Sequence, residues 1–413
     1  MVRGDRSFWS LVVGAGVFRI VYVLTAKLRK PVAGDEIYYS GQAEVIAAGR
    51  WFAHPFEPES FAADHVPLTS LAVAPMSWMA DPLLWQRLLM ALYGTGVVAL
   101  IGALAWRLAG RRVGLIATSV AAVYANLWMN DGLVMAETLA AGGVAAVLWF
   151  AYAVHESVSV QSIVALGVAV GAATLARAEM LGLLVVIAVP MVWVATRGRP
   201  GWARVQAVLA VVLVTVIVLA PWVGRNLVRF EETTLLSAQD GYALLGANCP
   251  RSYFGPDIGF WSAECGWDIA TDTSIDQSER SAIMRDQAVA YTSDNLDRVP
   301  VVVAARVARG LSLWRPDVMA WVNTGEGREV WAGRVGYVQF WLLAPLAVVG
   351  LARWRSAVPR WPLVVTAATS LALIAGLYGI PRFRIAAEVV IVIGAAIAVE
   401  RWWSVWLRRR SAS

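Results

Sequence analysis

The feature that most constrains this chain is a series of apolar stretches, each close to the ~20 residues that a helix needs to cross a membrane's hydrocarbon core. Hydrophobic residues make up 59% of the sequence and charged residues only 15%, whereas about a quarter of a soluble domain is charged. We therefore expect an all-α membrane protein that crosses the bilayer about ten times. The predicted spans are 8–26, 85–108, 113–129, 136–153, 162–176, 180–195, 205–223, 335–352, 362–379 and 385–406.

Arginine residues mark one set of connections between these spans. Cytoplasmic connections of membrane proteins carry an excess of Arg and Lys, so this set is predicted to face the cytoplasm, together with both termini. The expected location is the cytoplasmic (inner) membrane. Lys27, Arg29 and Lys30 argue the other way, but they lie in a long loop, where charge reports orientation poorly. The marked connections contain Arg3, Arg6, Arg111, Arg112, Arg197, Arg199, Arg204, Arg353, Arg355, Arg360, Arg408, Arg409 and Arg410.

Two long loops on the outer side complete the predicted single domain of residues 1–413. They run over residues 27–84 and 224–334 and are too long to be plain connections. Helical patterns at 36–51, 67–79 and 283–313 predict that both loops are partly helical. The second loop contains both cysteines, Cys249 and Cys265, which form either a disulfide or two free thiols.

The first loop holds the residues best suited to catalysis. Asp35 and Glu36 follow the first span directly, and Asp64 and His65 come before the second helical pattern. A carboxylate at this position can accept the proton of an attacking hydroxyl or hold an acceptor sugar by its hydroxyls. The alternative is that these acids cap helices in a solvated loop.

The order of these elements resembles the GT-C glycosyltransferases, most closely the protein O-mannosyltransferases and their bacterial relatives, which include the lipid A aminoarabinose transferases. The elements in question are Asp35-Glu36, Gly49-Arg50-Trp51-Phe52 and His65-Val66-Pro67-Leu68, with valine where the family has a first proline. The resemblance implies a GT-C fold and a polyprenyl-phosphate-linked sugar as donor. It also implies that Asp35 is the catalytic base or an acceptor-binding carboxylate, with Glu36 beside it.

Shorter elements extend the resemblance along the chain. Leu175–Glu179 is similar to a Leu-x-Arg-Pro-Glu element, Ala220–Asn226 to Pro-Trp-x-x-Arg-Asn, and Pro381–Arg384 to Arg-(Tyr/Phe)-Arg. Glu137 opens the fourth span and is a further candidate for the pocket, because an acid at membrane depth is costly. It could equally cap its helix.

Arginines near the outer ends of spans are suited to holding the donor's phosphate. A guanidinium group stays charged and offers a fixed fork of donors to phosphate oxygens. The alternatives are that these arginines extend to the interface and anchor helix ends, and that Arg177 pairs with Glu179. The candidates are Arg87, Arg177, Arg225, Arg382 and Arg384.

The sequence gives little indication of a cofactor. The three histidines do not cluster with cysteines at a zinc-binding spacing, although Asp35 and Asp64 could together hold a divalent cation. No glycine-rich phosphate loop precedes a helix. We therefore expect no required cofactor and no direct use of a nucleotide sugar.

These observations predict a glycosyltransferase at the outer face of the membrane. It would move mannose, arabinose or a similar sugar from the lipid-linked donor to a hydroxyl of a glycolipid, polysaccharide or protein of the cell envelope. The alternatives are a transporter or flippase of lipid-linked sugars, and a membrane scaffold without catalytic activity. Nucleic acid is not an expected partner, because the net charge of +6 forms no basic patch in a polar segment.

Overall fold

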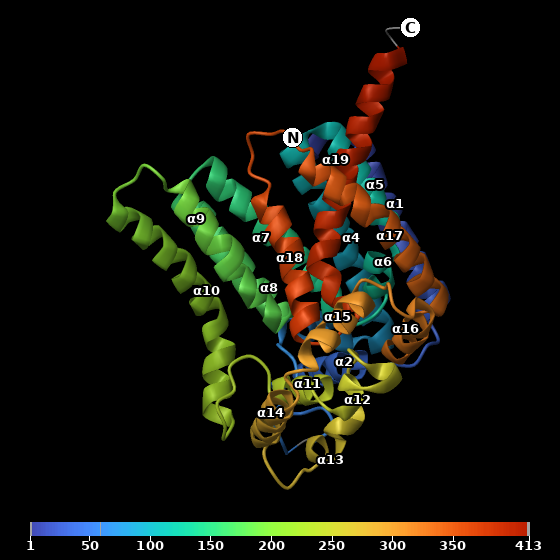
Figure 1. The fold of residues 1–413 in the computed structure, drawn as a ribbon, viewed down its shortest axis with the longest axis vertical. Coiled ribbons are helices and arrows are strands. Elements are labelled where there is room, and N and C mark those ends of the chain that lie inside the picture. The colour runs from blue at the N-terminus through green and yellow to red at the C-terminus, as the bar shows by residue number, and fades with distance from the viewer. Residues whose placement is uncertain (1, 58, 411–413) are drawn as a thin grey trace.

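The computed structural model describes residues 2–57 and 59–410, and within these ranges the regular secondary structure is helical apart from one isolated bridge between Ala53 and Phe61. The long apolar helices form one bundle (Figure 1). They are α1 (Arg6–Tyr22, continued by the π-helical turn Val23–Lys27), α4 (Pro82–Ala109), α5 (Arg111–Val123), α6 (Ala125–Asp131), α7 (Ala136–Glu156), α8 (Val160–Ala176), α9 (Val189–Ala195, preceded by η4, Ala178–Leu181, and η5, Leu184–Ala188), α10 (Gly201–Arg229), α17 (Val330–Ala352), α18 (Trp361–Gly376) and α19 (Ile385–Arg410).

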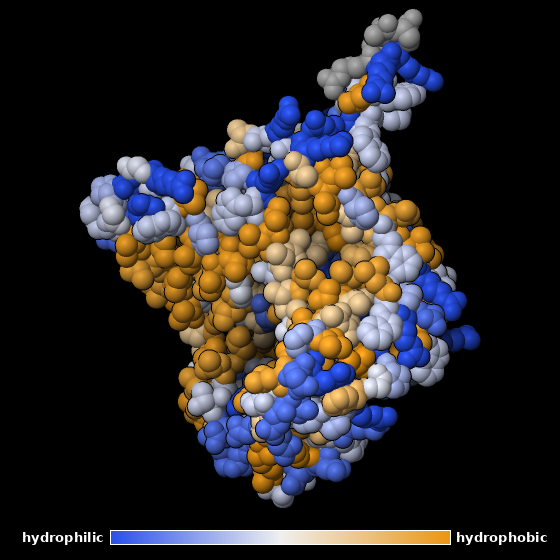
Figure 2. Space-filling model, viewed as in Figure 1, coloured by the Kyte–Doolittle hydropathy of each residue, from blue (hydrophilic) through white to orange (hydrophobic). Residues whose placement is uncertain are grey.

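The surface of the bundle fits a membrane. Figure 2 shows an apolar band across the visible face, with hydrophilic residues gathered at both ends. Among the described residues, six helical segments are long and apolar enough to span a bilayer, or seven if α5 and α6 together count as one. The all-helical membrane fold expected from the sequence is confirmed, while the count of ten spans stays a prediction.

The predicted span 113–129 is wrong as a continuous helix. The chain bends by 56° between α5 and α6, because Tyr124 adopts an extended backbone conformation. The bend is held by polar contacts: the Tyr124 hydroxyl donates to Glu388, and the amide of Ala125 donates to Gln339 Oε1 at 2.7 Å. Residues 123–125 gave no sequence signal for a break, since the partners come from distant helices.

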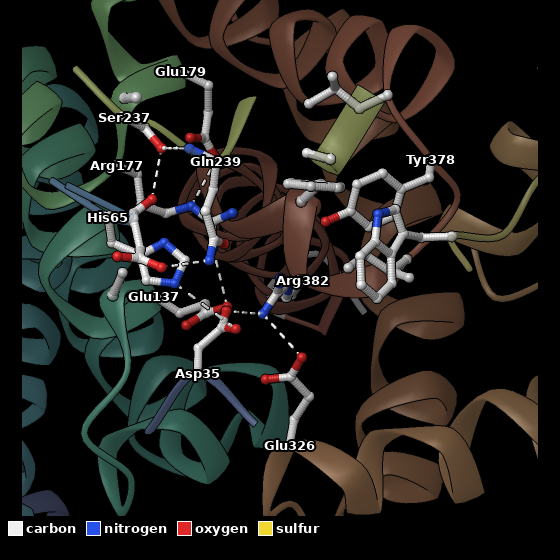
Figure 3. Close-up of a pocket in the computed structure, with 18 of the residues that line it drawn as sticks. Asp35, His65, Glu137, Arg177, Glu179, Ser237, Gln239, Glu326, Tyr378 and Arg382 are labelled. Atoms are coloured by element: carbon white, nitrogen blue, oxygen red, sulfur yellow. Dashed lines mark hydrogen bonds and ion pairs between the residues drawn. The ribbon is translucent and has the colours of Figure 1, made fainter. Parts of the chain in front are cut away.

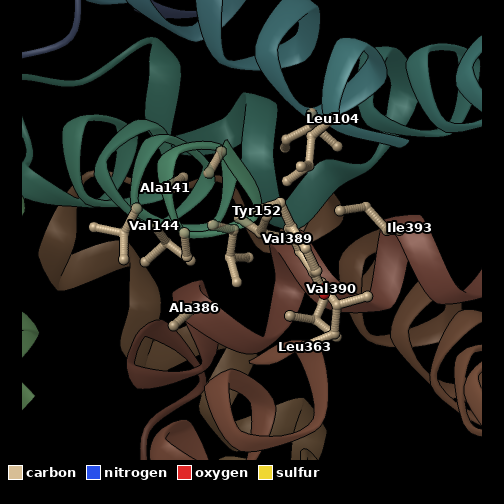
Figure 4. Close-up of a cluster of buried hydrophobic side chains, with 14 of the residues drawn as sticks. Leu104, Ala141, Val144, Tyr152, Leu363, Ala386, Val389, Val390 and Ile393 are labelled. Atoms are coloured by element: carbon tan, nitrogen blue, oxygen red, sulfur yellow. The ribbon is translucent and has the colours of Figure 1, made fainter. Parts of the chain in front are cut away.

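Helix α19 lies at the centre of the bundle. Residues 385–398 are buried on every side, as expected for a helix that is apolar all round. Figure 4 shows Val389, Val390 and Ile393 of α19 close to Leu104 of α4 and Leu363 of α18. All five belong to one large hydrophobic cluster, which fixes the position of the turn before α19.

The two long loops fold into a second layer at one end of the bundle. Both termini lie at the opposite end (Figure 1). At that end Arg111 Nε pairs with Asp5 at 2.6 Å, and Arg401 donates to the carbonyl of Arg353 at 2.6 Å. The second layer contains α2 (Asp35–Ala47), α3 (Leu68–Val73), α11 (Asp240–Ala247), α12 (Pro250–Tyr253), α13 (Trp267–Ala270), α14 (Gln277–Asp294), α15 (Val299–Gly310) and α16 (Pro316–Val322).

The segment between α11 and α14 is closed by a disulfide. The structure joins Cys249 and Cys265, whose Cα atoms are 6.3 Å apart. Cys249 is buried, and the ring so formed carries Trp261, which donates a hydrogen bond to the carbonyl of Tyr242 at 3.2 Å. The disulfide thus holds one wall of the cavity described below.

Replacing both cysteines, Cys249→Ser with Cys265→Ser, should loosen this segment. The chain-entropy account gives a loss of about 3 kcal/mol for a ring of roughly this size. Limited proteolysis of the protein in nanodiscs should cut residues 255–276 faster in the variant, while the bundle itself stays protected. Equal cutting rates in the oxidised wild type and the variant would contradict a role for the disulfide in holding this wall.

Candidate active site

Two cavities lie between the bundle and the second layer. The larger has a volume of about 570 Å³ and the smaller about 330 Å³. Five residues line both and so form the wall that separates the cavities. They are Asp35, Asp64, His65, Gln239 and Tyr242.

Asp35 occupies the first position of α2 at this wall. Its carboxylate therefore lies at the positive end of the helix dipole. The preceding Gly34 has a φ of +58°, and a Cβ added there would come within 2.7 Å of Glu326 Oε2. Only glycine fits this turn without strain, so the Gly-Asp sequence itself places the carboxylate.

The partners of Asp35 keep it ionised. Arg382 Nη1 donates to Asp35 Oδ2 at 2.7 Å, and His65 Nε2 lies 3.9 Å from Asp35 Oδ1 (Figure 3). Burial alone would raise the pKa of Asp35, but the guanidinium of Arg382 and the imidazole of His65 outweigh it and hold the pKa below its usual value. Asp35 is thus a carboxylate available to accept a hydrogen bond.

The larger cavity gathers guanidinium groups from three distant segments. Arg177 lies in the break between α8 and η4, Arg382 in the 3-10 turn Pro381–Arg384 before α19, and Arg328 just before α17. Such convergence on one space is the arrangement expected for binding an anion. Apolar residues line the rest of the cavity, among them Ala176, Ala178, Leu244, Leu377 and Phe383.

Carboxylates match these guanidinium groups in the structure. Arg177 pairs with Glu179 at 2.6 Å and with Glu137 at 3.0 Å, so the predicted Arg177–Glu179 contact is present. Arg328 Nη2 lies 3.4 Å from Glu137. Arg382 also contacts Glu326 at 3.2 Å, and among the described residues its Nε has no hydrogen-bond partner.

Asp64 and His65 hold the wall in place. The Asp64 carboxylate accepts from Gln239 Nε2 at 2.6 Å and lies 3.3 Å from His54 Nε2. Burial opposes its ionisation, but hydrogen bonds from His54 and Gln277 lower the pKa of Asp64. The His65 ring stacks on Tyr39 of α2 with centroids 4.8 Å apart.

Glu36 and Arg87 lie away from the two cavities, and their predicted roles at the site stay predictions. Both side chains are buried, and neither lines the two cavities. Arg87 donates to both carboxylate oxygens of Glu36, at 2.9 and 2.6 Å, and to the carbonyl of Lys27. Glu36 also accepts from the amide of Val134 at 2.9 Å. This pair joins α2 to α4.

Arg225 and Arg384 likewise contact protein oxygens, and their predicted role in binding the donor's phosphate stays a prediction. Arg225 donates to the carbonyls of Ala62 and Phe52, and neither cavity includes it. Arg384 is buried against Glu388 at 3.0 Å and donates to the carbonyl of Gly310. Both guanidinium groups satisfy buried protein oxygens.

Glu326 and Arg328 are among the site residues that sequence reasoning missed, as are Gln239 and Tyr242 of the wall. Glu326 and Arg328 flank Gly327 just before α17, and both line the larger cavity. The signal was present as a charged run, Glu326-Gly327-Arg328-Glu329, at the entrance of a span, where charges are costly.

The possible divalent-cation site at Asp35 and Asp64 stays a prediction. In the described part of the chain, no group of three or more His, Cys, Asp or Glu side chains is arranged to hold a metal ion. The carboxylates of Asp35 and Asp64 instead contact different partners, Arg382 for the first and Gln239 for the second.

Solved structures of oligosaccharyltransferases are similar to this one. The archaeal oligosaccharyltransferase AglB from Archaeoglobus fulgidus, in complex with an inhibitory peptide and a dolichol-phosphate, aligns over 98% of this chain and 51% of its own, with a TM-score of 0.56 and 13% identity. Its apo form aligns over 100% of this chain and 52% of its own, with a TM-score of 0.55 and 13% identity.

The protein has the GT-C fold. The chain spans about half the length of AglB. ArnT from Cupriavidus metallidurans, bound to undecaprenyl phosphate, aligns over 95% of this chain and 77% of its own at 17% identity and a TM-score of 0.47. No protein-family model matches the sequence, and no curated protein matches it significantly. At these identities the similarity establishes the GT-C fold and no more.

Arg87→Met should destabilise the protein, because it leaves the buried Glu36 carboxylate without a charge partner. Breaking a buried pair of this kind typically costs about 3–5 kcal/mol. The double variant Glu36→Gln with Arg87→Met should recover part of the loss. Thermal melting in detergent, followed by tryptophan fluorescence, measures both. An Arg87→Met protein that melts like the wild type but binds donor weakly would return Arg87 to the phosphate site.

Proposed function

We propose that the protein is a glycosyltransferase that moves a sugar from a polyprenyl-phosphate-linked donor to a hydroxyl group of an acceptor. The observation that carries this proposal is the position of Asp35, an ionised carboxylate in the wall between two cavities. One cavity contains three guanidinium groups and an apolar lining, and the other is lined mainly by polar and aromatic side chains. Such a wall is where an acceptor hydroxyl and a donor sugar can meet.

The donor fits the larger cavity. Its phosphate would lie at Arg382 and Arg177, with Arg328 behind them, and the first isoprene units would lie along the apolar residues. Figure 2 shows the visible face hollowed between α10 and the helices around α18, which gives a lipid tail a place beside the bundle. Arginine is suited to this role because it stabilises the charge that develops on the leaving phosphate.

The proposed reaction is a single displacement. The acceptor oxygen bonds to the anomeric carbon as the bond from that carbon to the phosphate oxygen breaks. The hydroxyl proton passes to Asp35, and polyprenyl phosphate leaves with the bonding electron pair. Displacement from the opposite face inverts the anomeric centre.

Glu326 has to give way to the donor. Its carboxylate lies against Arg382, which the phosphate would contact. Burial raises the pKa of Glu326, Arg382 opposes that effect, and the nearby Asp35 adds to it. Protonation of Glu326 would therefore release Arg382 to the phosphate.

The chain would work as an integral protein of the cytoplasmic membrane, with both termini in the cytoplasm and the site outside. The arginine-marked connections and the termini share one end of the bundle, and the two cavities lie at the other (Figure 1). Mannose and arabinose are the sugars we propose first, with cell-envelope glycans, glycolipids or proteins as acceptors.

Asp35→Asn should abolish sugar transfer. Loss of a general base typically lowers the rate about 10²–10⁴-fold, and the amide keeps the size of the side chain. Membranes with the wild type or the variant receive a radiolabelled polyprenyl-phosphate sugar and an envelope extract, and label in the acceptor is followed. Transfer that persists in the variant would exclude Asp35 as the base. Movement of lipid-linked sugar across the membrane without any transfer would favour a flippase.

Arg382→Gln should weaken donor binding and change the pH dependence of transfer. In the wild type, Arg382 holds the pKa of Asp35 low, so Asp35 remains ionised well into the acid range. Without Arg382, burial dominates and the pKa of Asp35 rises, so the acidic limb of kcat/KM should move to higher pH. Arg225→Gln is the matched control, because Arg225 lies outside both cavities. The acidic limb of kcat/KM and the donor KM of this variant should match those of the wild type. An acidic limb that stays in place in Arg382→Gln would contradict the effect of Arg382 on the pKa of Asp35.

A further inference from the structure

The 330 Å³ cavity is lined differently from the donor cavity. We propose that it binds the acceptor and that the acceptor is a neutral saccharide, an inference that rests on the glycosyl transfer proposed above. The cavity lies on the side of Asp35 away from Arg382 and Arg177, and its walls come from the first outer loop and from α14. Its volume is at the small end of the ~300–1,000 Å³ range of small-molecule sites.

Polar side chains that end in an amide, guanidinium or carboxylate group line this cavity. Gln277 and Arg280 of α14 are 9% and 4% exposed, and Asp64 lies in the wall shared with the donor cavity. Among the described residues, Gln277 Oε1 has no hydrogen-bond partner, although it is buried. Leaving such an acceptor unpaired is costly, and a ligand hydroxyl would satisfy it. Adjacent hydroxyl groups of a sugar suit amide, guanidinium and carboxylate ends of this kind.

Aromatic surface is available beside these polar groups. Phe56, whose side chain is 57% exposed, lines the cavity with Tyr38 and Tyr242. A ring face offers apolar contact to the C–H face of a sugar, while the hydroxyls at the sugar's edge reach the polar residues. The combination fits a pyranose or furanose ring better than a flexible chain.

The charges in the cavity disfavour an anionic acceptor. Three carboxylates, of Asp35, Glu57 and Asp64, line it together with one guanidinium. That guanidinium, Arg280, is already engaged by Glu57 at 3.3 Å and by the carbonyl of Ala270 at 3.0 Å. The imidazoles of His54 and His65 also line the cavity, and each lies beside a carboxylate, Asp64 for the first and Asp35 for the second. A phosphate or uronate brought here would compete with these carboxylates for every basic group, so the acceptor should be neutral.

The backbone around the cavity does not offer a peptide an open strand edge. Main-chain hydrogen bonds to such an edge are one of the recurring ways in which an extended peptide is bound. Here the amide of His54 donates to Ser60 and that of Ala62 to Phe52, at 2.8 and 2.9 Å, within the loop itself. The remaining walls are largely helical, and their backbone groups are paired internally.

The test begins with the acceptor that the protein itself selects. Membranes with the full chain transfer label from a polyprenyl-phosphate sugar into an envelope extract, and the product is digested with protease or with glycan hydrolases and run on an anion exchanger. Label that resists protease, is released by glycan hydrolases and is not retained as an anion supports the inference. Label released as glycopeptide, or retained as phosphate- or uronate-bearing glycan, overturns it. No product at all, with an active control enzyme, overturns the glycosyl transfer itself.

Variants then locate the acceptor in the cavity. With an octyl dimannoside as a soluble neutral acceptor, Gln277→Leu should raise the acceptor KM about tenfold and leave the donor KM unchanged. Gln287→Leu, at an exposed position of the same helix, is the matched control and should match the wild type. Phe56→Ala, at an exposed side chain, provides a second variant should Gln277→Leu fail to fold. Equal changes in donor and acceptor KM, or no change in either variant, would remove the acceptor from this cavity.

Discussion

Buried guanidinium groups matched by carboxylates are the interaction on which the rest of this structure depends. Arg19 pairs with Asp131 at 2.6 Å across 112 residues of sequence, and the half-buried Arg382 pairs with Asp35 across 347. A charge buried without a partner is far costlier than a buried pair. Each pair therefore joins segments that are distant in the chain, and the pairs together determine where the outer layer meets the bundle.

The same constraint explains what the sequence could and could not predict. Apolar length predicted the helices, and the place of Asp35 directly after the first span predicted that it lies in the outer layer. The sequence shows where an arginine lies, however, and not which oxygen it contacts. Arg382 and Arg384 are two residues apart in one turn, yet Arg382 reaches the cavity while Arg384 lies inside the bundle against Glu388.

Tertiary contacts also decided the roles of neighbouring acids. Asp35 and Glu36 are adjacent, but the helix directs Asp35 to the wall between the cavities and Glu36 to Arg87. Glu326 and Arg328 could be assigned to the site only once the segment before α17 was seen folded against α2. Residue type was enough to select the candidates from the sequence. Whether a candidate lines a cavity depends on the side chain that it contacts in the fold.

Gly34 has a mechanical consequence for the larger cavity. A Cβ at this residue would come within 2.7 Å of Glu326 Oε2 and 3.0 Å of Glu326 Cα, so the start of α2 and the turn Asn323–Glu326 are in contact through backbone as well as side chain. Rotation of one side chain cannot separate them. Widening the larger cavity at this point requires the backbone of the turn to move, and loop motions take nanoseconds to microseconds, whereas exposed side chains rotate in picoseconds to nanoseconds. A ligand that needs a wider opening at this point therefore enters and leaves only when this segment moves.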